Sequence, residues 1–551
     1  MDTQRLILFM LFTFSVFFLM DAWQKEAHPP RTVPAASTPG SVSSPVPTPT
    51  PASPAAKTPA SSPLAVSTAE GALQKGATIR VETDMFIAEI DTAGGDLRHL
   101  GLLGHRDTLD KKKNFTLLDQ TAHSYIAQSG LIGNELPNHR TIYATTDRDV
   151  KLAPGAASVE VRLTAQTPAG IRVVKVYTFH RDSYLIDIAY EVENKSPAPI
   201  QPDAYFQLVR DGTPPVGDSA MLPTYTGMAV YTDKEKFQKV AFTDVDKGKA
   251  SYPRKSNDGW IAFLQHYFLT AWLAPNNVPR EFYTKRLDNG LYTAGVILSV
   301  GQIEPGSTGT LKVPLYAGPE EQDKLSKLAP GLDLTIDYGW LTIIAQPLFW
   351  FLQWLHQWVS NWGVAIIILT VLLKAVFYPL SAASYRSMAR MRVMAPRLQK
   401  LKEQYGSDRQ RMNQAMMELY KTEKINPLGG CLPVVVQIPV FIALYWVLLA
   451  SDELRHAPFI LWIDDLSVAD PYFVLPVLMG ATMIFQTYLN PEPPDPVQAK
   501  IMKIMPIAFS VMFFFFPAGL VLYWLVNNVL SIAQQWQITR AVEQPKPAHG
   551  K

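Results

Sequence analysis

Apolar and polar residues alternate through the middle of this 551-residue chain, over residues 77–333. In one stretch Ile186, Ile188, Tyr190 and Val192 occupy every second position, and residues of other kinds stand between them. A period of two is typical of strands that bury one face. Because such strands recur and helical stretches are few, the region 77–333 is predicted to be a large antiparallel β-sandwich.

Beyond residue 333 the apolar residues gather in long blocks. The aromatic segment Trp340–Trp358, with a break predicted at Pro347, indicates an interfacial amphipathic helix within 334–361. Further apolar runs, long enough to cross a bilayer, lie at about 363–380, 430–450, 471–489, 501–516 and 520–536. With an N-terminal apolar run they predict a membrane bundle of six transmembrane helices, five of which form a core at 362–540.

The N-terminal apolar run spans Leu6 to Met20, follows Arg5, and is not followed by a convincing small-residue cleavage site. We interpret residues 1–27 as an uncleaved signal anchor, with a cleaved signal peptide as the alternative. Residues 28–76 are dominated by Pro, Ala, Ser and Thr, which cannot bury a core, so they are predicted to be a linker.

The segment between the second and third predicted spans is rich in arginine and lysine, whereas the next loop is acidic. The positive-inside rule places the basic segment in the cytoplasm. The sandwich then lies in the periplasm of a Gram-negative cell. An even number of spans puts the N-terminus and the tail at 541–551 in the cytoplasm.

Apolar residues recur at helical spacing on both sides of Gly406 and Ser407 within this basic segment. They predict a cytoplasmic helical hairpin over 381–427. Its methionines and cations suit a surface that docks anionic lipid or an RNA-rich particle. A solvated structural hairpin, basic only to set topology, is the alternative.

Several polar residues fall at membrane depth. Lys374 and Thr370 lie four residues apart on one helix face, Gln437 lies in the third span, and Asn528 lies in the last. A charge inside a bilayer is costly, so Lys374 either extends to the headgroups or faces a hydrated cavity. Each of the uncharged residues could instead make a hydrogen bond between helices.

A wet concavity open to the cytoplasm would lower the cost of moving polar segments into the bilayer. A cation at its end would attract acidic segments. The apolar residues Phe441, Tyr523 and Trp524 would then receive an emerging transmembrane helix.

The composition argues against several kinds of binding site and chemistry. A net charge of +2 gives no basic field for DNA, and the single cysteine, Cys431, excludes a disulfide or a cysteine cluster for metal. Gly429 and Gly430 lack the lysine of a phosphate-binding loop, and the histidines show no catalytic or metal-binding spacing. We therefore expect no enzymatic activity, no cofactor and no metal.

Several motifs resemble those of the YidC-type membrane protein insertases of Gram-negative bacteria. They are MARM at 388–391, LYKTEKINPLGGCLPVVVQIPVFIALYW at 419–446, LWIDDLS at 461–467, the DP pair at 470–471 and FPAGLVLYWLVNN ending at 528. The resemblance is specific over 340–540, and in the sandwich it depends on position and topology.

The resemblance implies an inner-membrane insertase and chaperone that acts on newly made membrane proteins, alone or with the Sec translocon. It implies a periplasmic super-sandwich, a cytoplasmic hairpin, and a hydrophilic groove with its cation at Lys374, where the family usually has arginine. Thr370, Gln437 and Asn528 become groove residues, and Phe441, Tyr523 and Trp524 a substrate-contacting slide. The ribosome or signal-recognition machinery, reached through hairpin and tail, and anionic phospholipids are further expected partners.

Two other functions are compatible with parts of this sequence. A secondary transporter could use Lys374 as its coupling site, but transporters generally show repeated halves, and no such internal repeat is apparent here. A periplasmic carbohydrate-active enzyme would need only one anchor, which leaves five further spans without a purpose.

Overall fold

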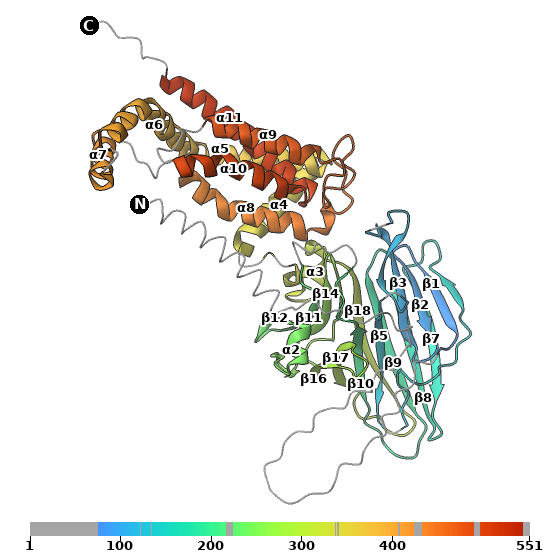
Figure 1. The fold of residues 1–551 in the computed structure, drawn as a ribbon. Coiled ribbons are helices and arrows are strands. Elements are labelled where there is room, and N and C mark those ends of the chain that lie inside the picture. Colours follow the sequence, from blue (N-terminus) through green and yellow to red (C-terminus); the bar gives the residue numbers. More distant parts are fainter. Residues whose placement is uncertain are drawn as a thin grey trace, which may run out of the picture. The chain divides into compact units, whose positions relative to one another are not determined.

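The computed structural model describes residues 75–108, 110–121, 123–133, 135–215, 224–336, 338, 341–405, 408–423, 432–489 and 496–543. It contains two compact units, a β-sandwich that ends at Ile336 and a helical unit that begins at Asp337 (Figure 1). The predicted anchor at 1–27, nearly all of the linker at 28–76, and most of the tail lie outside the described residues.

The sandwich consists of two sheets. The first has the order β13-β16-β17-β10-β5-β3-β2-β1-β6 with β4 beside β3, and the second has the order β12-β11-β14-β15-β18-β9-β8-β7. The strands are β1 (Thr78–Glu82), β2 (Phe86–Asp91), β3 (Asp96–Arg106), β4 (Asn114–Leu118), β5 (Tyr125–Ile132), β6 (Asp149–Lys151), β7 (Ser158–Gln166), β8 (Ile171–His180), β9 (Leu185–Asn194), β10 (Asp203–Arg210), β11 (Gly227–Thr232), β12 (Lys236–Val240), β13 (Lys255–Ser256), β14 (Trp260–Gln265), β15 (Phe268–Trp272), β16 (Arg280–Arg286), β17 (Tyr292–Ser299) and β18 (Thr308–Pro319). Except for β1 with β6, the paired strands are antiparallel.

The alternating pattern marks the buried face as predicted. In β9 the side chains of Ile186, Ile188, Tyr190 and Val192 are at most 1% exposed. β9 lies between β8 and β18, with Val192 opposite Val173 and Gly309. The prediction of an all-β sandwich is therefore confirmed.

A polar network lies in the sandwich core. Lys175 on β8 is fully buried, and its Nζ donates to the carbonyl oxygens of Gly94 at 3.1 Å and Ser129 at 3.3 Å. Asp96 on β3 is equally buried and accepts from Gln128 Nε2 at 2.9 Å. Burial raises the pKa of Asp96 to about 6 and lowers the pKa of Lys175 to about 8.

The remaining elements are mostly helical. They are α2 (Phe242–Asp246), α3 (Gln322–Leu328), the 3₁₀ turns η1 (Leu332–Thr335) and η4 (Asp452–Leu454), and the helices α4 (Thr342–Val359), α5 (Trp362–Val376), α6 (Tyr378–Tyr405), α7 (Arg409–Thr422), α8 (Leu432–Ala450), α9 (Val474–Leu489), α10 (Pro496–Phe513) and α11 (Ala518–Glu543).

The predicted break at Pro347 is wrong, because α4 continues through it. Ala345, Phe349, Leu352 and Leu355 are buried at helical spacing on one face of α4. Packing of this face stabilises the helix more than the single hydrogen bond lost at the proline destabilises it.

The predicted span at 363–380 is not one straight helix. α5 ends at Val376, α6 begins at Tyr378, and the two axes differ by 66°. Pro379 explains the break, since in a continuous helix it would remove a hydrogen bond and clash with the preceding turn, whereas it is tolerated in a first turn. Within the described residues, this bent pair, Trp362–Val376 with Tyr378–Met394, has the length and apolarity to cross a membrane, and no helix alone does.

The basic segment forms the two predicted helices. α6 ends at Tyr405, and Asp408 caps α7 by accepting from the backbone N–H groups of Gln410 and Arg411. Arg397 on α6 donates to Glu423, just beyond α7, at 2.7 Å. The structure has a helix on each side of residues 406–407, and the cytoplasmic hairpin over 381–427 remains a prediction.

Candidate functional site

Lys374 lies in the last turn of α5 and faces the inside of the helical unit. Its side chain is 5% exposed, whereas Val371, Leu372 and Val376 on the same helix are 43%, 40% and 71% exposed. The Nζ atom donates to Ser531 Oγ on α11 at 2.7 Å. This contact supports an inward-facing ammonium group over a lysine that extends along the outside of the helix to the headgroups.

The Ser531 hydroxyl connects three helices. It donates to the carbonyl oxygen of Asn527 at 2.7 Å, accepts from Lys374, and makes a hydrogen bond with Tyr385 on α6. A hydroxyl has one donor and two acceptor positions, so these contacts use its full capacity.

No described carboxylate forms an ion pair with Lys374. The ammonium has three N–H groups, and among the described residues only the bond to Ser531 is formed. Its positive charge is therefore held in place by a neutral group and remains available to an anion or to water.

Thr370 and Asn528 complete the buried polar surface. Thr370 is 1% exposed and donates from Oγ1 to the carbonyl oxygen of Ile366 at 2.7 Å. Asn528 is 5% exposed, and its Nδ2 has no hydrogen-bond partner among the described residues. A buried amide without a partner is costly, which is typical of a site that water or a ligand completes.

Gln437 lies apart from these contacts. Its side chain on α8 is half-buried, and no hydrogen bond of the described residues joins it to Lys374, Thr370 or Asn528. Among the described residues, the hydrogen bond from Lys374 to Ser531 joins α5 to α11, and none joins Thr370, Gln437 or Asn528 to this pair.

The three apolar candidates form one aromatic cluster. The Phe441 ring on α8 lies 4.4 Å from the Trp524 ring and 6.1 Å from the Tyr523 ring, both on α11, measured between centroids. Phe513 on α10 lies 5.7 Å from Trp524. The predicted slide residues therefore meet where α8, α10 and α11 pack together.

The sequence reasoning missed Ser531, Tyr385 and Gln535. Gln535 is 2% exposed and donates to the carbonyl oxygen of Leu489 at 3.2 Å. Asn528, Ser531 and Gln535 repeat at intervals of three and four, which places them on one face of α11. This polar stripe was the signal that could have revealed Ser531.

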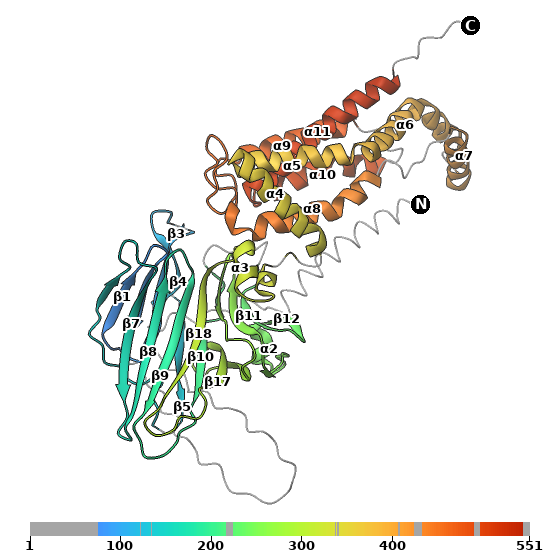
Figure 2. The ribbon, with the colours of Figure 1, turned by 180° about the vertical axis from the view of Figure 1, so that it is seen from behind.

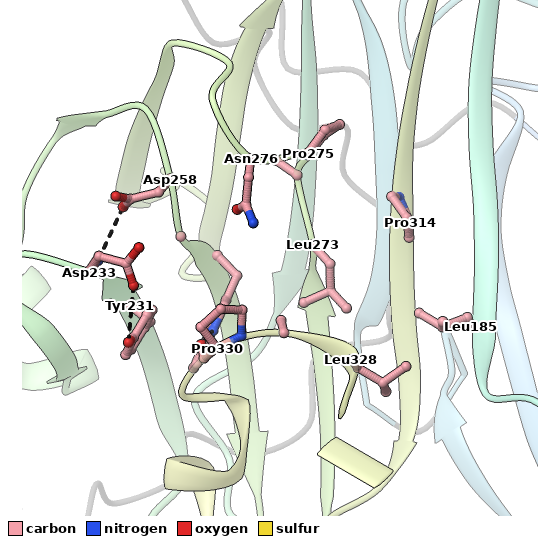
Figure 3. A pocket seen from close by; sticks show the side chains of 14 residues that line it. Leu185, Tyr231, Asp233, Asp258, Leu273, Pro275, Asn276, Pro314, Leu328 and Pro330 are labelled. Atoms are coloured by element: carbon pink, nitrogen blue, oxygen red, sulfur yellow. Dashed lines mark hydrogen bonds between the residues drawn. The ribbon is translucent and has the colours of Figure 1, made fainter. Parts of the chain in front are cut away.

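A hollow lies in the sandwich, beside the strand ends of β11, β14 and β15 (Figure 3). Its volume is about 230 Å³, and its walls are Leu185, Tyr231, Asp233, Asp258, Gly259, Trp260, Leu273, Ala274, Pro275, Asn276, Pro314, Leu328, Ala329 and Pro330. Tyr231 and Trp260 stack on each other and are 6% and 1% exposed, so little aromatic surface is open to a sugar. No group of metal-binding side chains occurs among the described residues.

Comparison with known proteins covers both units. The family model "YidC periplasmic domain" matches residues 78–351, and "60Kd inner membrane protein" matches 354–545. The chain is 57% identical to the membrane protein insertase YidC of Nitrosospira multiformis, over 98% of each chain. It is 55% identical to that of Methylobacillus flagellatus, over 99% of this chain and 98% of the relative, and 56% identical to that of Nitrosomonas europaea, over 98% and 91%.

Proposed function

The chain belongs to the YidC family of membrane protein insertases, and from that premise we propose how its buried polar residues serve insertion. The family is one of inner-membrane insertases and not of enzymes, and its substrates are nascent membrane proteins. The sandwich is the periplasmic domain of this family.

The proposal rests mainly on Lys374, an inward-facing ammonium group that has a hydroxyl partner and no described carboxylate. We propose that Lys374, Thr370 and Asn528 line a hydrated groove that opens to the cytoplasm. A charge and an unsatisfied amide stabilise water there, and water lowers the free energy of a polar substrate segment at membrane depth. Gln437 would line the same groove nearer its edge.

The positive charge of Lys374 would make the groove prefer acidic segments of the substrate. An acidic segment of the substrate is attracted to Lys374 in surroundings where charges are less screened than in bulk water. The neighbouring transmembrane segment would then pass along Phe441, Tyr523 and Trp524 and leave into lipid. Burial of its apolar side chains supplies the driving force, so no nucleotide is needed.

We further propose that both termini and the hairpin α6–α7 lie in the cytoplasm. Arg386, Arg390, Arg392, Arg397 and Lys400 are exposed along α6, which suits the positive-inside rule. The same cations and exposed Met417 on α7 would engage anionic phospholipids and the ribosome or signal-recognition machinery. We also propose that the protein can act together with the Sec translocon.

Labelling of single cysteines tests the groove. In a Cys431→Ser background, Lys374→Cys should react with a membrane-impermeant maleimide in inverted vesicles and stay unreacted in spheroplasts. Val371→Cys, on the exposed side of α5, is the matched control and should react in neither. Reaction of position 374 from both sides would indicate a continuous pore, and reaction from neither would indicate a dry site.

A further inference from the structure

A structured loop at 451–473 joins α8 to α9 and is unusual in which residues it buries. It is tied to α5 by Asn361, whose Nδ2 donates to the carbonyl oxygen of Phe459 at 3.0 Å. It is tied to the start of α11 by the backbone N–H of Gly519, which donates to the carbonyl oxygen of Leu466 at 2.9 Å. Figures 1 and 2 show the loop at the end of the helical unit away from α7.

The loop buries three carboxylate side chains, Asp452, Asp465 and Asp470, and the last two hold its framework together. Asp465 is 4% exposed and accepts from His456 Nδ1 at 2.8 Å and from Ser467 Oγ at 2.6 Å. Burial acts to raise the pKa of Asp465, but these hydrogen bonds outweigh it and lower the pKa to about 2.

Asp470 is 1% exposed and accepts from Trp462 Nε1 at 2.9 Å and from the backbone N–H of Leu475, in the first turn of α9, at 2.7 Å. Both carboxylates thus serve the internal framework of the loop and are removed from its surface.

The same loop turns apolar side chains outward. Leu461 is 82% exposed, Tyr472 is 70% exposed and Ile460 is 53% exposed. Leu461 and Phe473 each have a φ of +56°, a left-handed conformation that is unfavourable for a residue other than glycine. The hydrogen-bonded framework therefore holds these apolar residues out against a local backbone cost.

A surface that faces water normally shows the opposite arrangement, with carboxylates outside and leucine inside. The neighbouring surface is of the same kind, since α4 exposes Trp354 at 41% and Trp358 at 74%. α4 reaches the loop through Gln353, whose Nε2 donates to Glu453 at 3.5 Å. α4 and the loop, which are neighbours through this contact, thus both expose large apolar side chains.

We propose that the loop 451–473 is an interfacial anchor that inserts Ile460, Leu461 and Tyr472 into the phospholipid leaflet at this end of the bundle. The loop closes the ends of α5, α8, α9 and α11, so it lies where a membrane bundle leaves the hydrocarbon. Tyrosine and tryptophan concentrate at that level, and interfacial segments reach roughly 5 to 10 Å into the boundary of headgroups and acyl chains. The anchor would fix the depth and tilt of the bundle, and it does not depend on the groove proposed above.

Depth-dependent fluorescence quenching tests the anchor in the full chain. In the Cys431→Ser background, Leu461→Cys and Asp464→Cys are each labelled with an environment-sensitive fluorophore. The proteins are reconstituted into vesicles of phosphatidylethanolamine and phosphatidylglycerol that contain a lipid with a nitroxide high on its acyl chain. Asp464 is an exposed residue of the same loop and serves as the matched control.

The label at 461 should be quenched at least about twofold more strongly than the label at 464, because an interfacial side chain lies within the range of a shallow quencher. Tyr472→Cys gives a second position in case the label at 461 disturbs the loop, and it should behave like 461. Equal quenching at 461, 464 and 472 would overturn the proposal. Absence of quenching at 461 and 472, in vesicles that hold no other protein, would overturn it in favour of a protein partner.

Discussion

The sandwich and the helical unit each bury a lysine, and they surround it differently. Lys175 in the sandwich donates to two backbone carbonyl oxygens, lies 5.5 Å and 5.7 Å from the ring centroids of Tyr177 and Tyr190, and shares its core with the carboxyl group of Asp96. Lys374 in α5 has the hydroxyl of Ser531 and no described carboxylate partner.

The difference separates a structural charge from a functional one. A buried ammonium group with fixed acceptors, aromatic faces and a nearby anion is compensated by the fold itself. An ammonium group with a single neutral partner needs something else to stabilise it, which in a membrane insertase is water or the substrate.

Replacing Lys175 by methionine should destabilise the sandwich most. The change removes the stronger of two cationic neighbours of buried Asp96 and leaves only Arg98, whose Nη2 lies 3.9 Å from the carboxylate. Loss of one partner of a buried pair costs about 3 to 5 kcal/mol. Hydrogen exchange of β8 and β9 in the full-length protein should therefore become much faster. Lys195→Met removes an exposed lysine that pairs with Glu193 and is the control, with an expected cost below about 1 kcal/mol. Unchanged hydrogen exchange in Lys175→Met would contradict a structural role for Lys175 and Asp96.

The stability of the sandwich should depend on pH through Asp96. Its pKa is about 6 in the folded protein against an ordinary 3.8, so between these values the folded state holds a proton that the unfolded state has lost. Stability supplied by Asp96 is therefore full below about pH 4 and is lost as the pH rises through 6, by roughly 2 to 3 kcal/mol.

Asp96→Asn should abolish this dependence in urea titrations followed by circular dichroism. Asp149→Asn, at an exposed position of β6, should keep the wild-type profile. Parallel curves for wild type and Asp96→Asn from pH 4 to pH 7 would contradict the assignment.

In the helical unit, reversing the charge at position 374 should lower insertion more than a substitution that keeps the charge. Lys374→Glu places a carboxylate where an acidic substrate segment is expected, and should lower insertion about tenfold or more, which corresponds to about 1.4 kcal/mol. Lys374→Arg keeps the charge and should lower it less than about threefold. Insertion is measured as protease protection of a single-spanning substrate with an acidic tail, after depletion of the endogenous insertase. A substrate whose acidic tail is neutralised should be inserted almost equally well with a positive or a negative residue at position 374. Equal insertion defects for Lys374→Glu and Lys374→Arg with the acidic substrate would exclude a charge-based role.

The two lysines also show which features of the structure can be predicted from the sequence alone. Period-two alternation places Ile186 and Tyr190 on a buried face because a strand repeats over neighbouring residues. Lys374 is conspicuous because an apolar run surrounds it. These are local signals.

The partners of the two lysines are not local. Ser531 lies 157 residues from Lys374, and Gly94 lies 81 residues from Lys175, so only the folded chain pairs them. The bend after Val376 was missed for another reason. The apolar run continues across Pro379, and composition there outweighed the backbone restriction that the proline imposes.

Ser531→Ala should lower insertion less than charge reversal at position 374 does, and the size of the effect distinguishes a wet site from a dry one. The substitution removes the acceptor of Lys374 and leaves the charge in place. If water reaches Lys374, a water molecule replaces the hydroxyl, and the loss is one net hydrogen bond of about 1 kcal/mol, or roughly a fivefold fall in insertion. Ser531→Thr should restore most of it, and Ser510→Ala, where the hydroxyl bonds its own helix at Pro506, should have little effect. A fall of more than about a hundredfold would mean that the ammonium group is as dry as Lys175, since an uncompensated charge in a dry interior costs several kcal/mol, and the groove would then be excluded.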